Sequence, residues 1–351
     1  MNLPGDTAAE DPAGGPRVTA VIVAYGAEPL LEESVRSALA SDGVSADVVL
    51  VDNGCTDGAV DRLEGCPGVR VLRPGRNLGF AEGCCVGVEA SAAPLVALVN
   101  PDAVCFPAAL GALAAVAAQL DVGLATASVR LADRPELLNS AGNEVHFLGL
   151  SWSGAFEEPA SSHATPRDVC AASGAGMAFR REVWDRLGGF DGEFFAYYED
   201  ADLSLRCWLA GLSVHYVPGA VITHRYSFSK STEKYFLLER NRWVSTLSVA
   251  SARRLLVSLP GMVAQELALS LMARREGWTS EHRRARRWIL SHRRWIAARR
   301  RRVQATRTRT DAELADLFAV RLAPANMEVP ALLERIQPLL DLYWRIIRVL
   351  L

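Results

Sequence analysis

Short apolar runs alternate with amphipathic segments along the first 120 residues of the chain. Val18–Val23 is almost continuously apolar, which is typical of a strand that is buried on both faces of a parallel sheet. The apolar residues of Leu30–Leu39 instead follow helical spacing. Further strands are predicted at Asp47–Val51, Val69–Leu72 and Leu95–Val99, and further helices at Ala81–Ala90 and Ala108–Leu120. This alternation predicts an α/β fold with a mostly parallel sheet flanked by helices.

The pattern becomes more mixed in the second half of the chain. Helices are predicted over Arg181–Leu187 and Asp200–Ala210, each followed by glycine, and strands over Leu212–Val217 and Ala220–Thr223. From about Leu255 the composition changes, and we expect a helical, arginine-rich C-terminal region. The predicted organisation is therefore a disordered leader at 1–16, a catalytic domain at 17–250 and a helical region at 251–351.

Composition narrows the class of protein only slightly. Half of the residues are apolar and 22% are charged, as in an ordinary globular protein. The seven cysteines fit neither a disulfide framework nor a CxxC metal site, which favours reduced thiols and a cytoplasmic location. The N-terminus lacks the features of a signal peptide. Since no stretch of 18 uncharged apolar residues occurs, a conventional membrane-spanning helix is not expected.

Polar residues gather where the predicted strands end. The first strand leads into Tyr25, the second into Asp52-Asn53-Gly54, and the fourth into Asn100-Pro101-Asp102. Each could be an ordinary turn residue. Their recurrence at matching strand ends favours a ligand site, because parallel sheets bind ligands at this edge. Such carboxylates can bind a ribose or base, or hold a divalent cation beside phosphates. Neither GxxxxGK[ST] nor GxGxxG follows the first strand, which disfavours P-loop and nicotinamide enzymes.

A second group of acids follows an aromatic run. Glu199, Asp200 and Asp202 come directly after Phe194-Phe195-Ala196-Tyr197-Tyr198, at the predicted start of a helix. These acids could simply stabilise the helix N-terminus. A carboxylate beside an aromatic wall can also act as a general base toward an acceptor hydroxyl. His224 ends a strand-like run and is either a structural histidine or a metal ligand.

The chain resembles the family-2 glycosyltransferases with the GT-A fold, and within them the bacterial rhamnosyltransferase-like branch. The resemblance covers about residues 17–245, and its motifs occur in the family's order. They read VTAVIVAYG, VVLVDNGCTDG, GRNLGFAEG, LVALVNPDA, GAGMAFRREVWDRLGGFDGEFFAYYEDADLSLRCWLAG, VITHRYSFSK and ERNRW. A looser resemblance continues through about 255–320.

This resemblance implies a role for each matching residue. Tyr25 and Asp52 would line the nucleoside pocket, with Arg76 and Asn77 in the same donor cleft. Asp102 would coordinate Mg²⁺ or Mn²⁺, and His224 matches the position of a further metal ligand. Asp200 would be the catalytic base, with Glu199 beside it shaping the acceptor site. The reaction would be an inverting, metal-assisted transfer of a sugar from a nucleoside diphosphate to a hydroxyl group.

The chain departs from the family pattern at two places. The DxD signature reads Asn100-Pro101-Asp102, so one carboxylate is missing, a variant that the rhamnosyltransferase-like branch shares. Cys84-Cys85 stands where the family often has two asparagines. By branch, dTDP-rhamnose is the expected donor, ahead of UDP- and GDP-sugars. The acceptor would be a glycan, a glycolipid or a metabolite, for example in a cell-envelope polysaccharide.

Two other classes of protein were weighed. A sugar-1-phosphate nucleotidyltransferase would need a glycine-rich, basic loop after the first strand, and AYGAEPLLEE provides none. A nucleic-acid binder could use the twelve arginines of Arg283–Arg309, but no nucleic-acid-binding module is recognisable, so no nucleic acid is expected as a partner.

The C-terminal region also suggests a location. Pro260, Gln265 and Glu266 interrupt its apolar run, so we expect the region to lie on an anionic membrane surface without crossing it. Trp288 and Trp295, seven residues apart on a basic helix, would face the lipid. The enzyme would then be peripheral on the inner face of the cell membrane. The alternative is a helical cap that packs on the catalytic domain.

Overall fold

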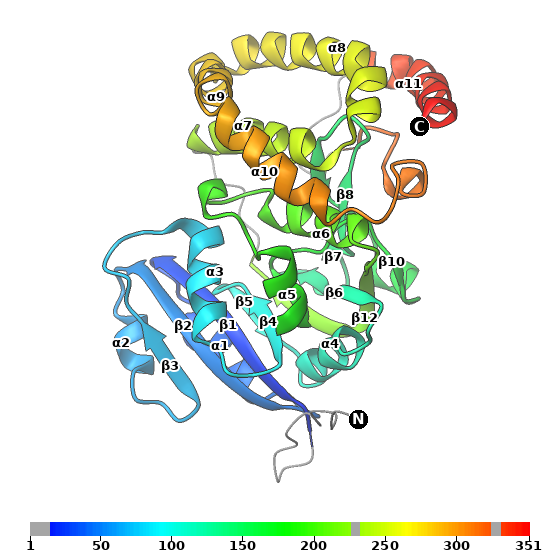
Figure 1. Ribbon diagram of the computed structural model, residues 1–351. Coiled ribbons are helices and arrows are strands. Elements are labelled where there is room, and N and C mark those ends of the chain that lie inside the picture. Colours follow the sequence, from blue (N-terminus) through cyan, green and yellow to red (C-terminus); the bar gives the residue numbers. More distant parts are fainter. Residues whose placement is uncertain (1–14, 226–231, 324–330) are drawn as a thin grey trace, which may run out of the picture.

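The computed structural model describes residues 15–225, 232–323 and 331–351 (Figure 1). Residues 1–14 of the predicted leader lie outside the described residues, as do Tyr226–Ser231 of the later motif. An α/β unit with one large sheet makes up the part up to His224, and helices form the rest (Figure 1).

The large sheet confirms the prediction of a mostly parallel α/β fold. Its main path runs β10-β12-β6-β11-β4-β1-β2-β3. Neighbours β1, β2, β3 and β4 pair in parallel, as do β6 and β12, whereas β11 runs antiparallel between β4 and β6. The bounds are β1 Arg17–Gly26, β2 Ser45–Cys55, β3 Val69–Leu72, β4 Leu95–Val99, β6 Val122–Leu131, β10 Arg167–Asp168, β11 Gly176–Arg180 and β12 Ser213–His224. The chain turns back between β1 and β4, and ligands of such sheets bind at this kind of reversal.

Helices cover both faces of the sheet. Helix α3 (Gly79–Ala90) lies very close to β1, because a Cβ atom at Gly87 would come within 2.3 Å of Val21 Cγ1. The opposite face carries α1 (Leu31–Leu39) and α4 (Ala109–Ala117), whose apolar residues share a core with Ile22 of β1. The short α2 (Ala59–Leu63) lies between β2 and β3. Since both faces of β1 are buried, its nearly continuous apolar sequence is explained.

Several elements of the second half were missed by the sequence analysis. Strand β6 joins the centre of the sheet although its sequence was not assigned, and the two predicted strands after Gly211 form one strand, β12, with irregular pairing between Val217 and Val221. Small strands complete this half: β5 Ala103–Cys105, β7 Leu138–Ser140, β8 Asn143–Val145 and β9 Ser151–Ser153. Helices α5 (Arg181–Leu187) and α6 (Glu199–Leu209) fall where they were predicted.

Among the described residues, five α-helices follow the large sheet and lie at the end of the molecule away from β2 and β3 (Figure 1). They are α7 Glu233–Val249, α8 Ala252–Glu276, α9 Thr279–Ser291, α10 Arg293–Ala305 and α11 Ala331–Leu350. Among the residues described, α8 is one helix that is long and apolar enough to cross a membrane by length and composition alone. Length and composition alone do not place α8 in a membrane, so the expectation that the chain has no conventional spanning helix remains a prediction.

Helix α8 continues through Pro260, which was expected to interrupt it. Proline removes one backbone donor from a helix and disturbs the preceding turn. The phenol of Tyr343 in α11 bridges two backbone groups of this turn. It accepts from Gly261 N at 3.1 Å and donates to Val257 O at 2.9 Å. A side chain from another helix thus bridges the backbone groups next to the proline.

Two arginines of α10, buried Arg299 and half-buried Arg300, bind groups inside the protein, whereas the other arginines of α9 and α10 are exposed. Arg300 and Gln304 of α10 donate to backbone carbonyls at the C-terminal end of α7, the end of a helix where basic groups are favourable. Trp288 stacks on His292 and, like Trp295, is half-buried against the core. Trp288 and Trp295 thus pack partly against the protein, and the expectation that they face a membrane remains a prediction.

Candidate functional site

Asp52 lies at the carboxyl end of β2, opposite Ala24 of β1 and therefore close to Tyr25. Asp52 Oδ1 accepts from Gly54 N at 3.1 Å and from Cys55 N at 2.9 Å, and Oδ2 lies 3.6 Å from Arg73 Nε. Tyr25 is 59% exposed and its ring lies next to Gly54. An exposed ring beside a fixed carboxylate can stack on a base while the carboxylate accepts from it. The structure brings together the two residues predicted for the nucleoside.

The predicted Asn77 has a partner that the sequence analysis did not single out. Buried Asn53 donates to Asn77 Oδ1 at 3.1 Å and to Gly79 O at 2.9 Å, and accepts from Leu78 N at 2.9 Å. These bonds join the end of β2 to the loop before α3. Arg76 is exposed on that loop. Asn53 belongs to the strand-end motif of the sequence, but an asparagine at that position could equally be an ordinary turn residue.

Asp102 and His224 meet at the carboxyl end of β4. His224 Nε2 lies 3.1 Å from Asp102 Oδ1 and 3.2 Å from Asn100 Nδ2. The other ring nitrogen, Nδ1, lies 3.0 Å from Asn139 Oδ1, which accepts its proton. This bond sets the tautomer in which Nε2 carries a lone pair, as metal-binding histidines require. A carboxylate in the turn before β5 and an imidazole at the end of β12 form a donor set that fits a divalent cation such as Mn²⁺.

Glu28 is a further acid of this region that the sequence analysis missed. It lies on the loop between β1 and α1, and its backbone N–H donates to Asp57 Oδ2 at 2.8 Å. Burial, and then the negative charges of Asp102 and Asp57, raise the pKa of Glu28 to about 7. Glu28 therefore shares the electrostatic environment of Asp102.

Asp200 lies at the start of α6 and is held by three N–H donors. Its Oδ2 accepts from Asn143 Nδ2 and from Gly174 N, both at 3.0 Å, and its Oδ1 accepts from Ala201 N at 2.7 Å. Burial raises the pKa of this carboxyl group, and the three donors oppose that rise by stabilising the ionised form. Asn143 comes from β8, 57 residues earlier, and nothing in the sequence pointed to it.

One short segment connects this carboxylate to the turn that holds Asp102. Gly174 N donates to Asp200, and the next carbonyl, Ala175 O, accepts from Asn100 N at 3.2 Å. Gly174 and Ala175 therefore link the part of the site around Asp200 to the part around Asp102.

Glu199 has a different environment from Asp200. Its side chain is buried, and no partner for Oε2 is found among the described residues. Burial, and then the charge of Asp200, raise the pKa of Glu199 to about 8. Buried Cys84, one of the two cysteines that replace the family's asparagines, lies close enough for the two groups to interact electrostatically. When the two acids share one proton, it resides on Glu199, and Asp200 stays ionised.

The aromatic run before α6 has an unusual backbone. Phe195, Tyr197 and Tyr198 have φ angles of 61°, 68° and 78°, in the left-handed region that non-glycine residues rarely adopt. Asn241 of α7, from the ERNRW motif, donates from Nδ2 to the carbonyls of Phe194, Ala196 and Tyr197 at 2.7–2.9 Å. Strained backbone persists only where its surroundings hold it, and here a buried amide does so.

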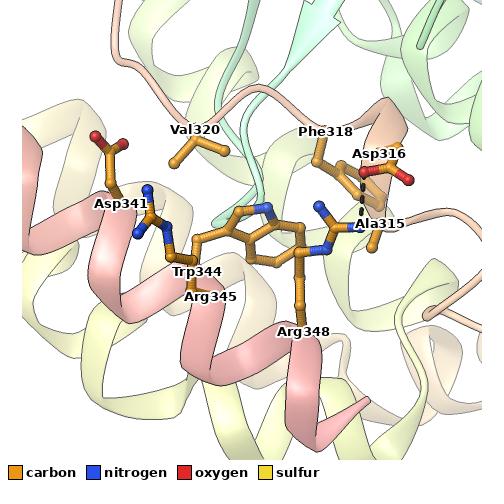
Figure 2. A pocket seen from close by; sticks show the side chains of 8 residues that line it. All are labelled: Ala315, Asp316, Phe318, Val320, Asp341, Trp344, Arg345 and Arg348. Atoms are coloured by element: carbon orange, nitrogen blue, oxygen red, sulfur yellow. Dashed lines mark ion pairs between the residues drawn. The ribbon is translucent and has the colours of Figure 1, made fainter.

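Two other features of the molecule lie outside this site. Glu239, Glu266 and His282 are close enough to hold a metal, but the guanidinium of Arg242 pairs with both carboxylates. Burial opposes ionisation of Glu239, yet Arg242 and His282 outweigh it and lower its pKa to about 2, so this is an ion-pair network. A cavity of about 310 Å³ lies between α11 and the segment before it, where Arg348 pairs with Asp316 at 2.7 Å (Figure 2). No strand-end residue lines it.

Comparison with known proteins agrees with the geometry. The family model described as "Glycosyltransferase like family 2" matches residues 16–246. The chain is 30% identical over 243 residues to an N-acetylglucosaminyl-diphospho-decaprenol L-rhamnosyltransferase of Mycobacterium tuberculosis, which covers 60% of this chain and 76% of that protein. It is 36% identical over 91 residues to the rhamnosyltransferase WbbL of Escherichia coli K12, over 25% of this chain and 33% of that one.

Solved structures share the fold at low identity. GalNAc-T7 with UDP, GalNAc and Mn²⁺ superposes with a TM-score of 0.55 at 15% identity, over 66% of this chain and 48% of that one. The mannosyltransferase PcManGT from Pyrobaculum calidifontis, in complex with GDP-Man and Mn²⁺, has a TM-score of 0.50 at 20% identity, over 87% and 89% of the two chains. The chain is a glycosyltransferase of family 2 with the GT-A fold, distantly homologous to bacterial rhamnosyltransferases, and it transfers a sugar from a nucleotide-sugar.

Proposed function

We propose that this enzyme is an inverting rhamnosyltransferase that moves rhamnose from dTDP-rhamnose to a hydroxyl group of a lipid-linked glycan. The transferred sugar and the acceptor class are supported by the rhamnosyltransferase relatives, one of which acts on a decaprenol-linked sugar. One observation carries the mechanism: Gly174 and Ala175 connect Asp200, whose carboxylate accepts from three N–H groups, to the turn of Asp102. A base and a diphosphate site are thereby neighbours.

Asp200 supplies the base for a single displacement. The acceptor hydroxyl gives its proton to the Asp200 carboxylate while its oxygen attacks the anomeric carbon. The bond from that carbon to the diphosphate oxygen breaks on the opposite face, the nucleoside diphosphate leaves with the electron pair, and the configuration inverts. Asn143, Gly174 and Ala201 orient the carboxylate for this transfer. Protonated Glu199 adds no second negative charge, so Asp200 can remain ionised beside it.

Asp102 and His224 would hold Mg²⁺ or Mn²⁺ against the donor. When bound, the ion neutralises negative charge on the diphosphate. An imidazole ligand favours Mn²⁺ over Mg²⁺, because Mg²⁺ prefers oxygen ligands. Asn139 keeps the His224 ring oriented, and Tyr25 and Asp52 bind the nucleoside. The seven cysteines are free thiols, which supports the predicted cytoplasmic location.

A donor panel tests the proposal. The full-length enzyme is incubated with a polyprenyl-diphosphate-linked glycan and with dTDP-rhamnose, UDP-sugars or GDP-sugars, and release of the nucleoside diphosphate is measured with Mn²⁺, with Mg²⁺ and with EDTA. We expect the highest turnover with dTDP-rhamnose and Mn²⁺, and a β-configured product from an α-configured donor, or the reverse. Retention of configuration, or full activity in EDTA, would contradict the mechanism. A preference for a UDP- or GDP-sugar would overturn the donor assignment.

A further inference from the structure

Helix α8 exposes a continuous apolar face. All exposed residues of α8 between Arg253 and Arg274 are apolar. The exposed fractions of Leu256, Leu267 and Leu271 are 71%, 62% and 64%. Leu259 and Val263 occupy the same helical face, with about half of each side chain in solvent. Exposed apolar patches of this extent mark interaction sites.

Helix α11 exposes a second apolar face. Leu339, Leu342, Ile346 and Val349 repeat at helical spacing, and all four are exposed by half or more. On the opposite side of the same helix, Trp344 and Ile347 are buried in the core. The helix therefore uses one apolar side to pack on the protein and keeps another apolar side free.

The two helices are in direct contact. The Tyr343 phenol of α11 lies inside the hydrogen-bond ladder of α8, between Val257 and Gly261. Figure 1 shows α8 along the outer edge of the molecule, with α11 beside it. On each helix, the residues at this contact are direct neighbours of the exposed positions.

Arginines frame this surface. Arg253 precedes the apolar face of α8, and Arg274 and Arg275 follow it; all three are exposed. Arg335 and Arg345 are exposed on α11 next to its apolar positions. Apolar side chains bordered by cations match a bilayer with anionic headgroups, which takes up the leucines below the headgroups and pairs with the arginines.

We propose that the exposed faces of α8 and α11, here called the docking surface, bind an anionic lipid bilayer with both helices lying in its plane. The inference rests on the proposed function only where it uses a lipid-linked acceptor. A second copy of the chain fits the surface poorly, because a symmetric interface would bring the same arginine-rich borders together. Crossing the bilayer is disfavoured for α8, because Glu266 is bound by Arg242, by Trp243 at 3.2 Å and by Arg286 at 3.1 Å.

The docking surface is also connected to the catalytic carboxylate. Gln265 of α8 donates to Leu148 O at 3.3 Å, and Trp344 of α11 stacks on Phe147 at 4.7 Å between ring centroids. A few residues earlier on the same segment, Asn143 donates to Asp200. The helices that contact the bilayer thus support the segment that holds the base, where a lipid-linked hydroxyl must arrive.

Liposome flotation of the full-length chain tests the proposal. Vesicles of phosphatidylcholine alone are compared with vesicles that also contain phosphatidylglycerol, at low and high salt. We expect binding to the anionic vesicles that weakens in high salt, and release by alkaline carbonate, as for a protein that does not cross the bilayer. Leu267→Gln and Leu342→Gln should each weaken binding about tenfold. Leu120→Gln, at an 81% exposed leucine after α4, is the matched control and should bind like the wild type.

Several results would overturn the proposal. They are wild-type protein that does not float, variants that bind like the wild type, or a control that loses binding equally. Resistance to carbonate would show that α8 crosses the bilayer. Concentration-dependent dimerisation that both substitutions abolish, without lipid binding, would assign the surface to a second copy. Flotation needs no sugar substrate, and nucleoside diphosphate release with a short soluble acceptor should be unchanged in all variants. Failure of lipid binding is therefore distinguishable from failure of the proposed reaction.

Discussion

The nucleoside side and the acceptor side of the active site are built in different ways. Asp52 is held by the backbone of Gly54 and Cys55, two and three residues away, and Asn53 and Asn77 lie on successive loops. Asp200 is instead held by Asn143, and its helix by Arg299 of α10 through Asp202. The nucleoside side depends on contacts between residues that are close in sequence. The acceptor side forms only when distant segments of the chain pack together. Substitutions should therefore have mainly local effects on the nucleoside side and far-reaching effects on the acceptor side.

The largest effect is expected at Asp200. Asp200→Asn removes the base but keeps the shape of the side chain, so turnover should fall by about 10²–10⁴-fold while donor binding barely changes. Turnover is measured as nucleoside diphosphate release, and donor affinity by calorimetry. Asp185→Asn, on the exposed side of α5, is the control. Turnover near the wild-type value would assign the base to another residue, with Glu199 and Asp202 as the nearest acids.

The pH dependence of turnover should report the ionisation of the Asp200 carboxyl group. Asp200 must be ionised to accept a proton, and burial raises its pKa. Activity should therefore be lost as the pH falls, at a higher pH than the ordinary aspartate value of about 3.9 would give. Asn143→Ala removes one donor to the ionised form and should move this loss to still higher pH. An acid limb that does not move would show that Asn143 does not position the base.

A stability effect of about 3 kcal/mol is expected from Arg299→Met. Arg299 Nη2 lies 2.6 Å from Asp202 Oδ2 and Nε lies 2.9 Å from Asp191 Oδ2, and its loss leaves Asp202 buried with Arg206 as its other cationic partner. Chemical denaturation measures the free energy of unfolding. Arg301→Met, exposed on the same helix, should cost little. Equal losses in the two variants would mean that the acceptor side does not depend on α10.

The sequence predicts the carboxylates and the tyrosine of this site better than it predicts the groups that hold them in place. Tyr25, Asp52 and Asp102 follow strands whose apolar runs are easy to recognise, and the strand-end rule places them at one edge. Asn143, Gly174 and Arg299 carry no such signal, because hydrogen bonds between distant segments depend on how the chain packs. Composition also does not show which side chains of α8 through α10 are buried: Glu266 and Arg299 pack inward, whereas Leu256 is exposed.

On the nucleoside side, Asp102→Ala should mainly change the response to metal. Loss of one ligand should reduce Mn²⁺-stimulated turnover on the order of 10²-fold and weaken donor binding when Mn²⁺ is present. The stability of the fold should hardly change, because Asp102 lies in an open turn. Titration with Mn²⁺ is followed by turnover and by donor affinity, with Asp133→Ala on an exposed turn as control. Unchanged Mn²⁺ dependence would assign the diphosphate charge to basic side chains instead.

The smallest effect is expected from Glu199→Gln. The pKa of Glu199 is about 8 in the folded protein and about 4.3 in an unfolded chain. Between these values the folded state keeps a proton that the unfolded state has lost, so stability falls as pH rises from about 4 to 8. Glutamine removes this dependence and should raise the melting temperature at pH 8 by about 3 °C, with less gain at pH 5. Exposed Glu89→Gln is the control, and an equal gain at both pH values would contradict the buried acid.

The ion pair between Asp202 and Arg299 has two practical consequences. A fragment ending near residue 250 would lack Arg299, one of the two arginines that pair with Asp202 on the helix that carries the proposed base. If the docking surface binds lipid as proposed, replacement of its exposed leucines is the better route to a soluble enzyme. For the same reason, helices taken from a relative would have to supply a second cation beside Arg206 to neutralise Asp202 fully. Compatibility between the two halves of such a hybrid therefore depends in part on this buried charge.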